Sequence, residues 1–342
     1  AGLVWRIISD RKTAFETGWS CRRTGRSAPF CGLRKERWNV KKKKKVLKME
    51  TINNLVGWGF ALPAVLGFLI LNLIPMLLSA YYSFCNYGII GTPEWIGLDN
   101  YIALFTGEET TFWISVRCTA LYAIMAVPAN LAFAFAIAIL LNRDMKGRAF
   151  FRSLFYLPCI LPAVASSFVW ILLMNPDFGL FNMILEFLHL PKSQFFWGKD
   201  SVLPSIVFMG IWSTGSTQVI FLAGLQDIPR GYYEALEIDG GNAWHKFRHI
   251  TLPMISPTMF FNLVMGIIGA LQVFGQAYII TEGGPNNASL FYVYNLWREA
   301  FRYMEMGVAS AMAWILFLVV LVLTVIVFKT SNKWVYYEGG DD

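Results

Sequence analysis

The stretch "MGVASAMAWILFLVVLVLTVIVF", residues 306–328, decides the class of fold. It contains no charged side chain and is long enough for an α-helix to cross the hydrocarbon core of a bilayer, which takes about 20 apolar residues. Five more runs without charge precede it, at 51–93, 118–142, 153–176, 201–226 and 250–281. We therefore expect an all-α membrane protein with six transmembrane helices, near 57–84, 118–141, 153–175, 203–225, 257–280 and 308–328.

The composition agrees with this class. Of the 342 residues, 56% are hydrophobic and only 15% are charged, whereas a soluble domain carries about 25% charged residues. The net charge of +7 does not indicate nucleic-acid binding, because it comes from the N-terminal segment. Within residues 1–50 alone, the excess of Lys and Arg over Asp and Glu is larger than the net charge of the whole chain. We expect this basic cytoplasmic tail to be largely disordered, with its five lysines at 41–45 beside anionic lipid. Residues 51–335 would form the membrane domain and 336–342 a second cytoplasmic tail.

Lysine and arginine are distributed unevenly over the connections between the six predicted helices. Most of the 29 lie in the N-terminal tail, the loops at 142–152 and 226–255, and the C-terminal tail. The other connections hold Arg117, Lys192, Lys199, Arg298 and Arg302. Since cytoplasmic connections carry the excess of Lys and Arg, we expect both termini to be cytoplasmic.

Signatures of catalysis are missing from the sequence. It has no Gly-x-x-x-x-Gly-Lys-[Ser/Thr] phosphate loop, no Gly-x-Ser-x-Gly elbow and no His-Glu-x-x-His motif. His245 and His249 lie four apart, but no third ligand is in view, so we expect no metal site. We therefore expect no catalytic residue and no cofactor in this chain. A membrane enzyme such as a glycosyl transferase would need a pair of acids near a membrane face, and none stands out.

The six predicted helices also lack ionisable side chains, apart from Arg117 at one edge. Proton- and ion-coupled transporters usually keep an acid, a base or a histidine at membrane depth. This absence argues against a stand-alone secondary carrier or channel for a small polar solute, which is the alternative class.

Between the fourth and fifth predicted helices lies a charged segment, "EALEIDGGNAWHKFRHITLP" at 234–253. Pro229 suits the first position of a helix, Asp239-Gly240 suits a turn, and Asn242 can cap a second helix. We therefore expect a helix–turn–helix hairpin over 229–253. A rigid, partly apolar knob suits a groove on another protein; the alternative is a loop that packs against its own membrane helices.

The same segment resembles the EAA loop of bacterial ABC-importer permeases, which has the form EAA-x₃-G-x₉-I-x-LP. Leu236 replaces the third-position alanine, and the spacing is kept by Glu234, Ala235, Asp239, Gly240, Ile250, Leu252 and Pro253. Three more stretches resemble the maltose-type branch: "GLDNYIALF" at 97–105, "AGLQDIP" at 223–229 and "TEGGPNNASLFYVYNLWREAF" at 281–301. The resemblance runs from roughly 57 to 335.

This resemblance implies a type I ABC-importer permease fold in the bacterial cytoplasmic membrane. The chain would be one permease subunit of an ATP-driven, binding-protein-dependent importer of a carbohydrate. Its implied partners are a second, homologous permease, two ATPase subunits that bind ATP and Mg, and an extracytoplasmic sugar-binding protein. Within the loop, Glu234 would pair with a basic group on the ATPase, and Asp239-Gly240 would shape the turn. Trp244 and Phe247 would fill a groove on the ATPase.

The fourth predicted helix carries an unusual polar patch, "IWSTGSTQ" at 211–218. An aromatic ring beside hydroxyl and amide groups suits a sugar. The candidate substrate path therefore combines residues of two predicted helices. One face of the fourth helix contributes Met209, Trp212, Ser213 and Ser216, and the fifth helix contributes two glutamines four residues apart, Gln272 and Gln276. The alternative is close helix packing, which also uses small and hydroxyl residues.

Other irregularities are expected along the chain. Pro128, Pro158 and Pro162 should bend their helices. A short amphipathic helix is expected over 177–190, and Gly283-Gly284-Pro285 should form a turn.

Overall fold

The computed structural model describes residues 54, 57–107 and 110–336. The chain divides into two compact units, 1–66 and 67–342, and the packing described below is that of the second unit. The predicted basic tail over 1–50 and the residues 337–342 lie outside the described residues.

Three helices are long and apolar enough to cross a membrane without a sharp bend: Gly57–Tyr82, α5 (Thr110–Asn142) and α16 (Met306–Ser331). The first ends in a π-helical stretch, η1 (Leu69–Leu73), and α3 (Ile74–Tyr82). These correspond to the predicted first, second and sixth helices, but α5 begins at Thr110, before the predicted start at 118, and therefore includes Arg117. Three further segments are pairs of helices joined at a bend, so the described residues hold up to six spans by length and composition.

The third predicted helix, 153–175, is sharply broken. α6 (Arg148–Ile160) and α7 (Ala163–Leu173) meet at 99°. Leu161 between them is extended, with φ −65° and ψ 136°, as expected for a residue that precedes a proline. The bend predicted at Pro162 is confirmed, and the prediction of one continuous helix is wrong.

The fourth predicted helix, 203–225, is also interrupted. α9 (Val202–Trp212) and α10 (Gly215–Asp227) meet at 49°, with Ser213 and Thr214 at the break. The Thr214 hydroxyl donates to the carbonyl of Ile211 at 2.8 Å, and such a local side-chain bond competes with the backbone ladder of the helix.

The fifth predicted helix, 257–280, ends early. α14 (Ser256–Leu271) stops before Gln272, and a π-helical stretch, η4 (Ala277–Thr281), follows after a turn. The interruption covers Gln272, Val273 and Phe274, and helical structure resumes at Gly275. Gln272 and Gln276 therefore do not lie on one continuous helix, contrary to the prediction.

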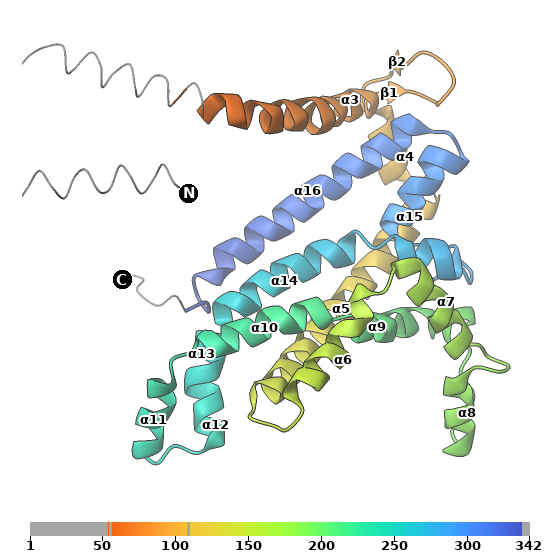
Figure 1. Ribbon diagram of the computed structural model, residues 1–342. Coiled ribbons are helices and arrows are strands. Elements are labelled where there is room, and N and C mark those ends of the chain that lie inside the picture. Colours follow the sequence, from red (N-terminus) through yellow and green to blue (C-terminus); the bar gives the residue numbers. More distant parts are fainter. Residues whose placement is uncertain (1–53, 55–56, 108–109, 337–342) are drawn as a thin grey trace, which may run out of the picture. The chain divides into compact units, whose positions relative to one another are not determined.

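α5 is the centre of the second unit, because α9, α10, α14 and α15 (Tyr292–Trp297) all pack against it (Figure 1). Near its start, Thr119 accepts a hydrogen bond from the backbone N–H of Tyr292 at 2.8 Å. Its final turns, with Ala134, Ala138 and Leu141, are buried against α10 and the start of α14. The two ends of α5 thus fix two opposite ends of the helical bundle.

The end of the bundle near the start of α5 is built from short elements. A two-stranded antiparallel ribbon, β1 (Cys85–Asn86) and β2 (Glu94–Trp95), precedes α4 (Asp99–Thr106). This small ribbon is an exception to the all-α prediction. η2 (Phe195–Trp197) and η5 (Arg298–Arg302) follow later in the chain. The predicted amphipathic helix is present as α8 (Leu180–Phe187).

Candidate functional site

The predicted hairpin is present at the end of α10 (Figure 1). It consists of α11 (Arg230–Ile238), α12 (Ala243–Lys246), the π-helical η3 (Phe247–Thr251) and α13 (Leu252–Met254). Gly240 has φ +78°, the left-handed conformation that a side chain disfavours. The Asn242 side chain caps α12 by accepting from the backbone N–H of His245 at 3.0 Å. The predicted turn and cap are therefore confirmed, while Pro229 is extended and precedes the first helical residue.

Several contacts hold the two arms of the hairpin together. Glu237 on α11 forms an ion pair with Lys246 on α12. The hydroxyls of Tyr233 and Thr251 lie 3.1 Å apart. A Cβ atom added at Gly241 would lie 2.5 Å from Cγ of Leu236, so the backbone passes the first helix too closely for a side chain. These contacts make the hairpin a rigid unit.

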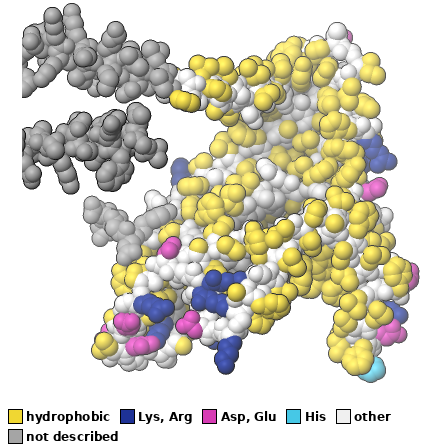
Figure 2. All heavy atoms as spheres, in the orientation of Figure 1, with side chains coloured by type: hydrophobic (Ala, Val, Ile, Leu, Met, Phe, Trp, Pro, Cys, Tyr) yellow, Lys and Arg dark blue, Asp and Glu magenta, His cyan; other side chains and the backbone are white. Residues whose placement is uncertain are grey.

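The predicted coupling residues divide by exposure. Glu234, Ala235, Asp239, Gly240, Trp244 and Leu252 are exposed, while Phe247, Ile250 and Pro253 are half-buried. Ile238 is 87% exposed at the tip and was not predicted. Its apolar side chain, next to the charged turn residue Asp239, is the sequence signal that could have found it. Figure 2 shows acidic and basic side chains on the same hairpin.

Phe247 faces the bundle more than the surface. It lines a cavity of about 470 Å³ between the hairpin and the end of α5, and its ring centre lies 6.2 Å from that of Phe135. The exposed Trp244 ring stacks on Phe247 at 5.6 Å. Phe247 therefore supports Trp244 from behind, and Trp244 offers the apolar surface of α12.

A second cavity, of about 320 Å³, lies where α9 and α10 break, between α5 and α14. Unlike the surrounding bundle it is rich in hydroxyl and amide groups, contributed by Tyr122, Asn130, Ser213, Thr214, Thr217, Asn262 and Gln276. Its other walls are apolar or glycine. Hydroxyls and amides can each donate and accept hydrogen bonds, so this cavity offers both to a neutral polar ligand.

Asn130 has an unused acceptor in this cavity. Its side-chain Oδ1 is buried and has no hydrogen-bond partner among the described residues. Gly210 faces it, and even a Cβ atom there would lie 3.7 Å from the Asn130 amide and from the Tyr122 hydroxyl. A buried acceptor left unpaired costs about 1–3 kcal/mol. A hydroxyl that entered the cavity would remove this cost.

The candidate substrate path is only partly gathered here. Ser213 and Gln276 line the cavity, whereas Trp212, Ser216 and Gln272 are exposed and outside it. Met209 is 5% exposed within a core cluster. The stripe from Met209 to Ser216 requires a continuous helix, and the break at Ser213 rotates its two halves apart. Asn130 and Asn262 were missed, although each is an isolated amide within an apolar run.

Comparison with known proteins gives a consistent result. Residues 130–334 match the family described as binding-protein-dependent transport system inner membrane component. A probable ABC transporter permease protein of Bacillus subtilis, YesP, is 42% identical over 85% of this chain and 94% of its own length. The trehalose/maltose transport system permease protein MalF of Thermococcus litoralis is 30% identical, over 81% and 94%.

A solved structure gives the same fold. The crystal structure of a bacterial ABC transporter involved in the import of the acidic polysaccharide alginate has a chain with a TM-score of 0.74 and 22% identity, covering 84% of this chain and 98% of its own. With both sequence and fold in agreement, this chain belongs to the family of binding-protein-dependent transport system inner membrane components, the permease subunits of ABC transporters.

Proposed function

We propose that this permease imports a carbohydrate, an oligosaccharide in particular, and that it forms half of the translocation pathway. The observation that carries the proposal is the continuity between the two sites. α10 lines the polar cavity and leads into α11, while η3 and α13 lead back into α14, which lines the same cavity. A displacement of the rigid hairpin is therefore transmitted to two walls of the cavity.

The hairpin would couple the chain to an ATPase subunit, and two such subunits would bind ATP and Mg²⁺. Glu234 is exposed on α11 and supplies a carboxylate for a basic partner group. Trp244 and Ile238 are exposed apolar side chains that suit a groove, since buried aromatic anchors dominate most protein interfaces. Asp239 and Gly240 shape the turn between them. The chemistry of ATP hydrolysis would remain with the partner.

The cavity would be one side of a substrate path that a second, homologous permease completes. Ser213, Gln276 and the unpaired Oδ1 of Asn130 provide hydrogen bonds suited to sugar hydroxyls. Trp212, 57% exposed beside the break, provides an aromatic face for a sugar ring at the edge of that path. The relatives named for trehalose and maltose, and for alginate, motivate the choice of carbohydrate.

The proposed topology has six spans with both termini in the cytoplasm. The backbone N–H of Tyr336, beyond α16, donates to Ser256 at the start of α14 at 2.8 Å. Arg143, at the end of α5, lines the hairpin cavity. The C-terminal end, the loop after α5 and the hairpin thus share one end of the bundle, which carries most of the described Lys and Arg. A sugar-binding protein would dock at the opposite end.

The test is uptake by reconstituted vesicles. The chain is co-expressed with a second permease, the ATPase and the binding protein encoded beside it, and uptake of radiolabelled neutral and acidic oligosaccharides is measured with and without ATP. We expect uptake of one oligosaccharide class that requires both ATP and the binding protein. Uptake that follows an ion gradient in the absence of the ATPase would contradict the proposal.

A further inference from the structure

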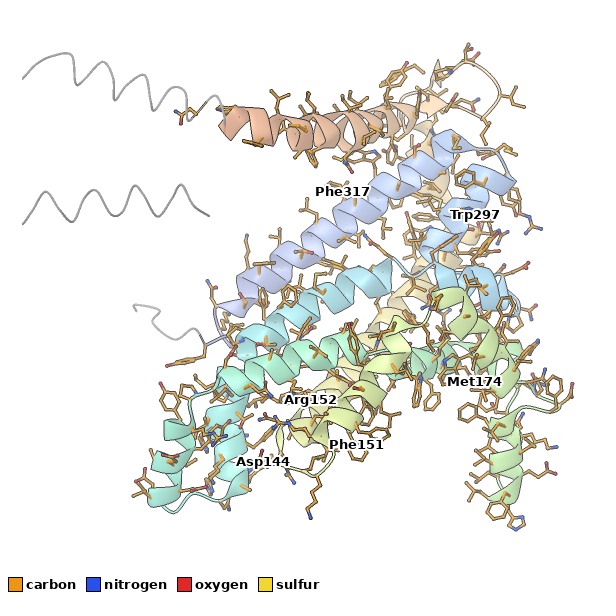
Figure 3. All side chains as sticks on the ribbon, viewed as in Figure 1. Asp144, Phe151, Arg152, Met174, Trp297 and Phe317 are labelled. Carbon is orange, nitrogen blue, oxygen red and sulfur yellow. The ribbon has the colours of Figure 1, made fainter. Side chains whose placement is uncertain are left out.

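Two arginines at the start of α6 share one neutral partner. When the Gln226 amide is oriented with its oxygen toward the arginines, which satisfies both ends of the amide, this oxygen accepts from Nη2 of Arg148 at 2.9 Å and from Nη2 of Arg152 at 2.5 Å. The Nε atoms of both are buried without an acceptor in the described structure. Arg148 also has an acidic neighbour, Asp144, at 3.5 Å, whereas Arg152 has no ion pair within the described ranges. Figure 3 shows Arg152 near the start of α6, beside α10.

This arrangement leaves positive charge uncompensated. Asp144 is 94% exposed, and an exposed ion pair contributes little. Arg148 and Arg152 lie one turn apart, so their like charges oppose each other. Guanidinium groups bind phosphate oxygens through paired N–H donors. The start of α6 therefore offers two guanidinium groups to an anion.

An apolar groove leads away from these arginines. It has a volume of about 220 Å³ and lies between α6 and α10, with Arg152 and Tyr156 on one wall and Leu141 of α5 beside them. Its α10 wall is a single helix face with spacings of three and four residues: Gly215, Gln218, Val219, Leu222, Ala223 and Gln226. Val219 is 50% exposed and Tyr156 is 40% exposed, so the groove opens to the outside of the described chain.

The groove has the length of one lipid leaflet. From Gln226 to Gly215 the helix rises by about 16 Å, and half of the bilayer hydrocarbon core is about 15 Å. At Gly215 the helices meet closely, because an added Cβ atom would lie 2.9 Å from the carbonyl oxygen of Phe155 and 3.1 Å from the Cα atom of Tyr156. The groove is therefore charged at the membrane surface and closed near the membrane centre.

We propose that this groove binds one anionic phospholipid of the leaflet on the hairpin side. The phosphate lies on Arg148 and Arg152, and one acyl chain runs along α10 toward Gly215. Basic pockets between membrane helices recognise acidic headgroups in this way. Figure 2 shows basic side chains gathered at this end of the bundle, with hydrophobic side chains farther along it. The site is separate from the polar cavity and does not depend on the transported solute.

The site has a consequence for the hairpin. Gln226 is the last residue but one of α10, and α11 begins at Arg230. A phosphate that joins both arginines ties α6 to the base of the hairpin. An anionic lipid at this position therefore acts on the element that carries movement to the cavity.

The test measures lipid selectivity of the full chain with its associated subunits. The purified complex is stripped of lipid, mixed with phosphatidylglycerol or phosphatidylcholine in detergent micelles, and bound lipid is quantified by mass spectrometry. We expect wild type to prefer phosphatidylglycerol, and Arg152→Gln to weaken that binding about fivefold, the value for one basic residue near a membrane surface. Lys146→Gln, in the loop that precedes α6 and outside the groove, is the matched control and should change nothing.

A second variant addresses the acyl chain. Ala223 is exposed in the groove, so Ala223→Phe fills it without entering the protein core and should weaken binding of both lipids. Unchanged phosphatidylglycerol binding in both Arg152→Gln and Ala223→Phe would overturn the proposal. So would full displacement of the lipid by soluble glycerol phosphate, because the site would then recognise the headgroup alone. Loss of a protein subunit from Arg152→Gln, with lipid binding unchanged, would assign the arginines to a protein partner instead.

Discussion

The turn of the hairpin can be tested by replacing Gly240 with valine. Gly240 has φ +78°, and an added Cβ atom would meet nothing within 4 Å. The cost of the substitution is therefore purely conformational, about 1–2 kcal/mol or more for a residue with a side chain in the left-handed region. Gly231 is the matched control, because it also has open space around it but lies within α11 without a positive φ.

Hydrogen exchange measures the effect without any partner protein. The backbone N–H groups of Gly240 and Gly241 donate to Glu237 at 3.0 Å and to Leu236 at 2.8 Å. A cost of 1–2 kcal/mol raises the open population about 5- to 30-fold, so exchange in this peptide should quicken by that factor in Gly240→Val. Gly231→Val should leave it nearly unchanged.

The two variants should differ in the same way in their coupling to the ATPase. Gly240→Val should reduce co-purification of the ATPase and uptake, while Gly231→Val should preserve both. Equal exchange in the two variants would refute the assignment of strain to the turn. Faster exchange in Gly240→Val with unchanged uptake would show that the hairpin conformation does not matter for coupling.

Three other predictions follow from the same geometry. Glu234→Lys should leave hairpin exchange unchanged and abolish ATPase co-purification, since Glu234 is exposed; retained co-purification would contradict its role. Asn130→Leu removes a buried unpaired acceptor, so the melting temperature should stay or rise while uptake falls. Ser213→Phe should preserve the yield of the complex and block uptake. A lower melting temperature for Asn130→Leu, or a collapsed yield for Ser213→Phe, would show that the cavity residues form a packing surface. In a cysteine-free background, Ile90→Cys, which replaces a side chain that is 96% exposed, should react with an impermeant maleimide on sealed cells and Lys146→Cys should not; the opposite pattern would reverse the topology.

The sequence predicted features that depend on neighbouring residues more accurately than features that depend on tertiary packing. The hairpin turn at Gly240 and the cap at Asn242 depend on residues within a few positions of each other, and both are confirmed. Pro162 likewise bends the chain where a proline should. Local conformational preference dictates such features, so a single sequence suffices to predict them.

The polar cavity could not be predicted in the same way. Its residues come from α5, the break between α9 and α10, and the region around the end of α14, so only the packing brings them together. The break at Ser213 lies within the polar patch at 211–218, which we interpreted as one face of a continuous helix, and the absence of charge alone does not reveal a break there. The prediction that Met209 lines the substrate path is therefore wrong, because Met209 is buried in a core cluster. The ribbon that includes Cys85 was hidden for a similar reason, since two-residue strands leave no periodic pattern.

The wide turn of η3 has a consequence for how the chain could vary. A π-helical turn holds one residue more than an α-helical turn, and one residue corresponds to about 100° of helical rotation. Phe247–Thr251 therefore sets the angular phase between Trp244, which faces outward, and α14, which faces the cavity. Deleting one residue there would allow an ordinary helix to form, yet it would turn Trp244 away from its present direction. The length of this segment therefore determines the direction in which Trp244 points relative to α14.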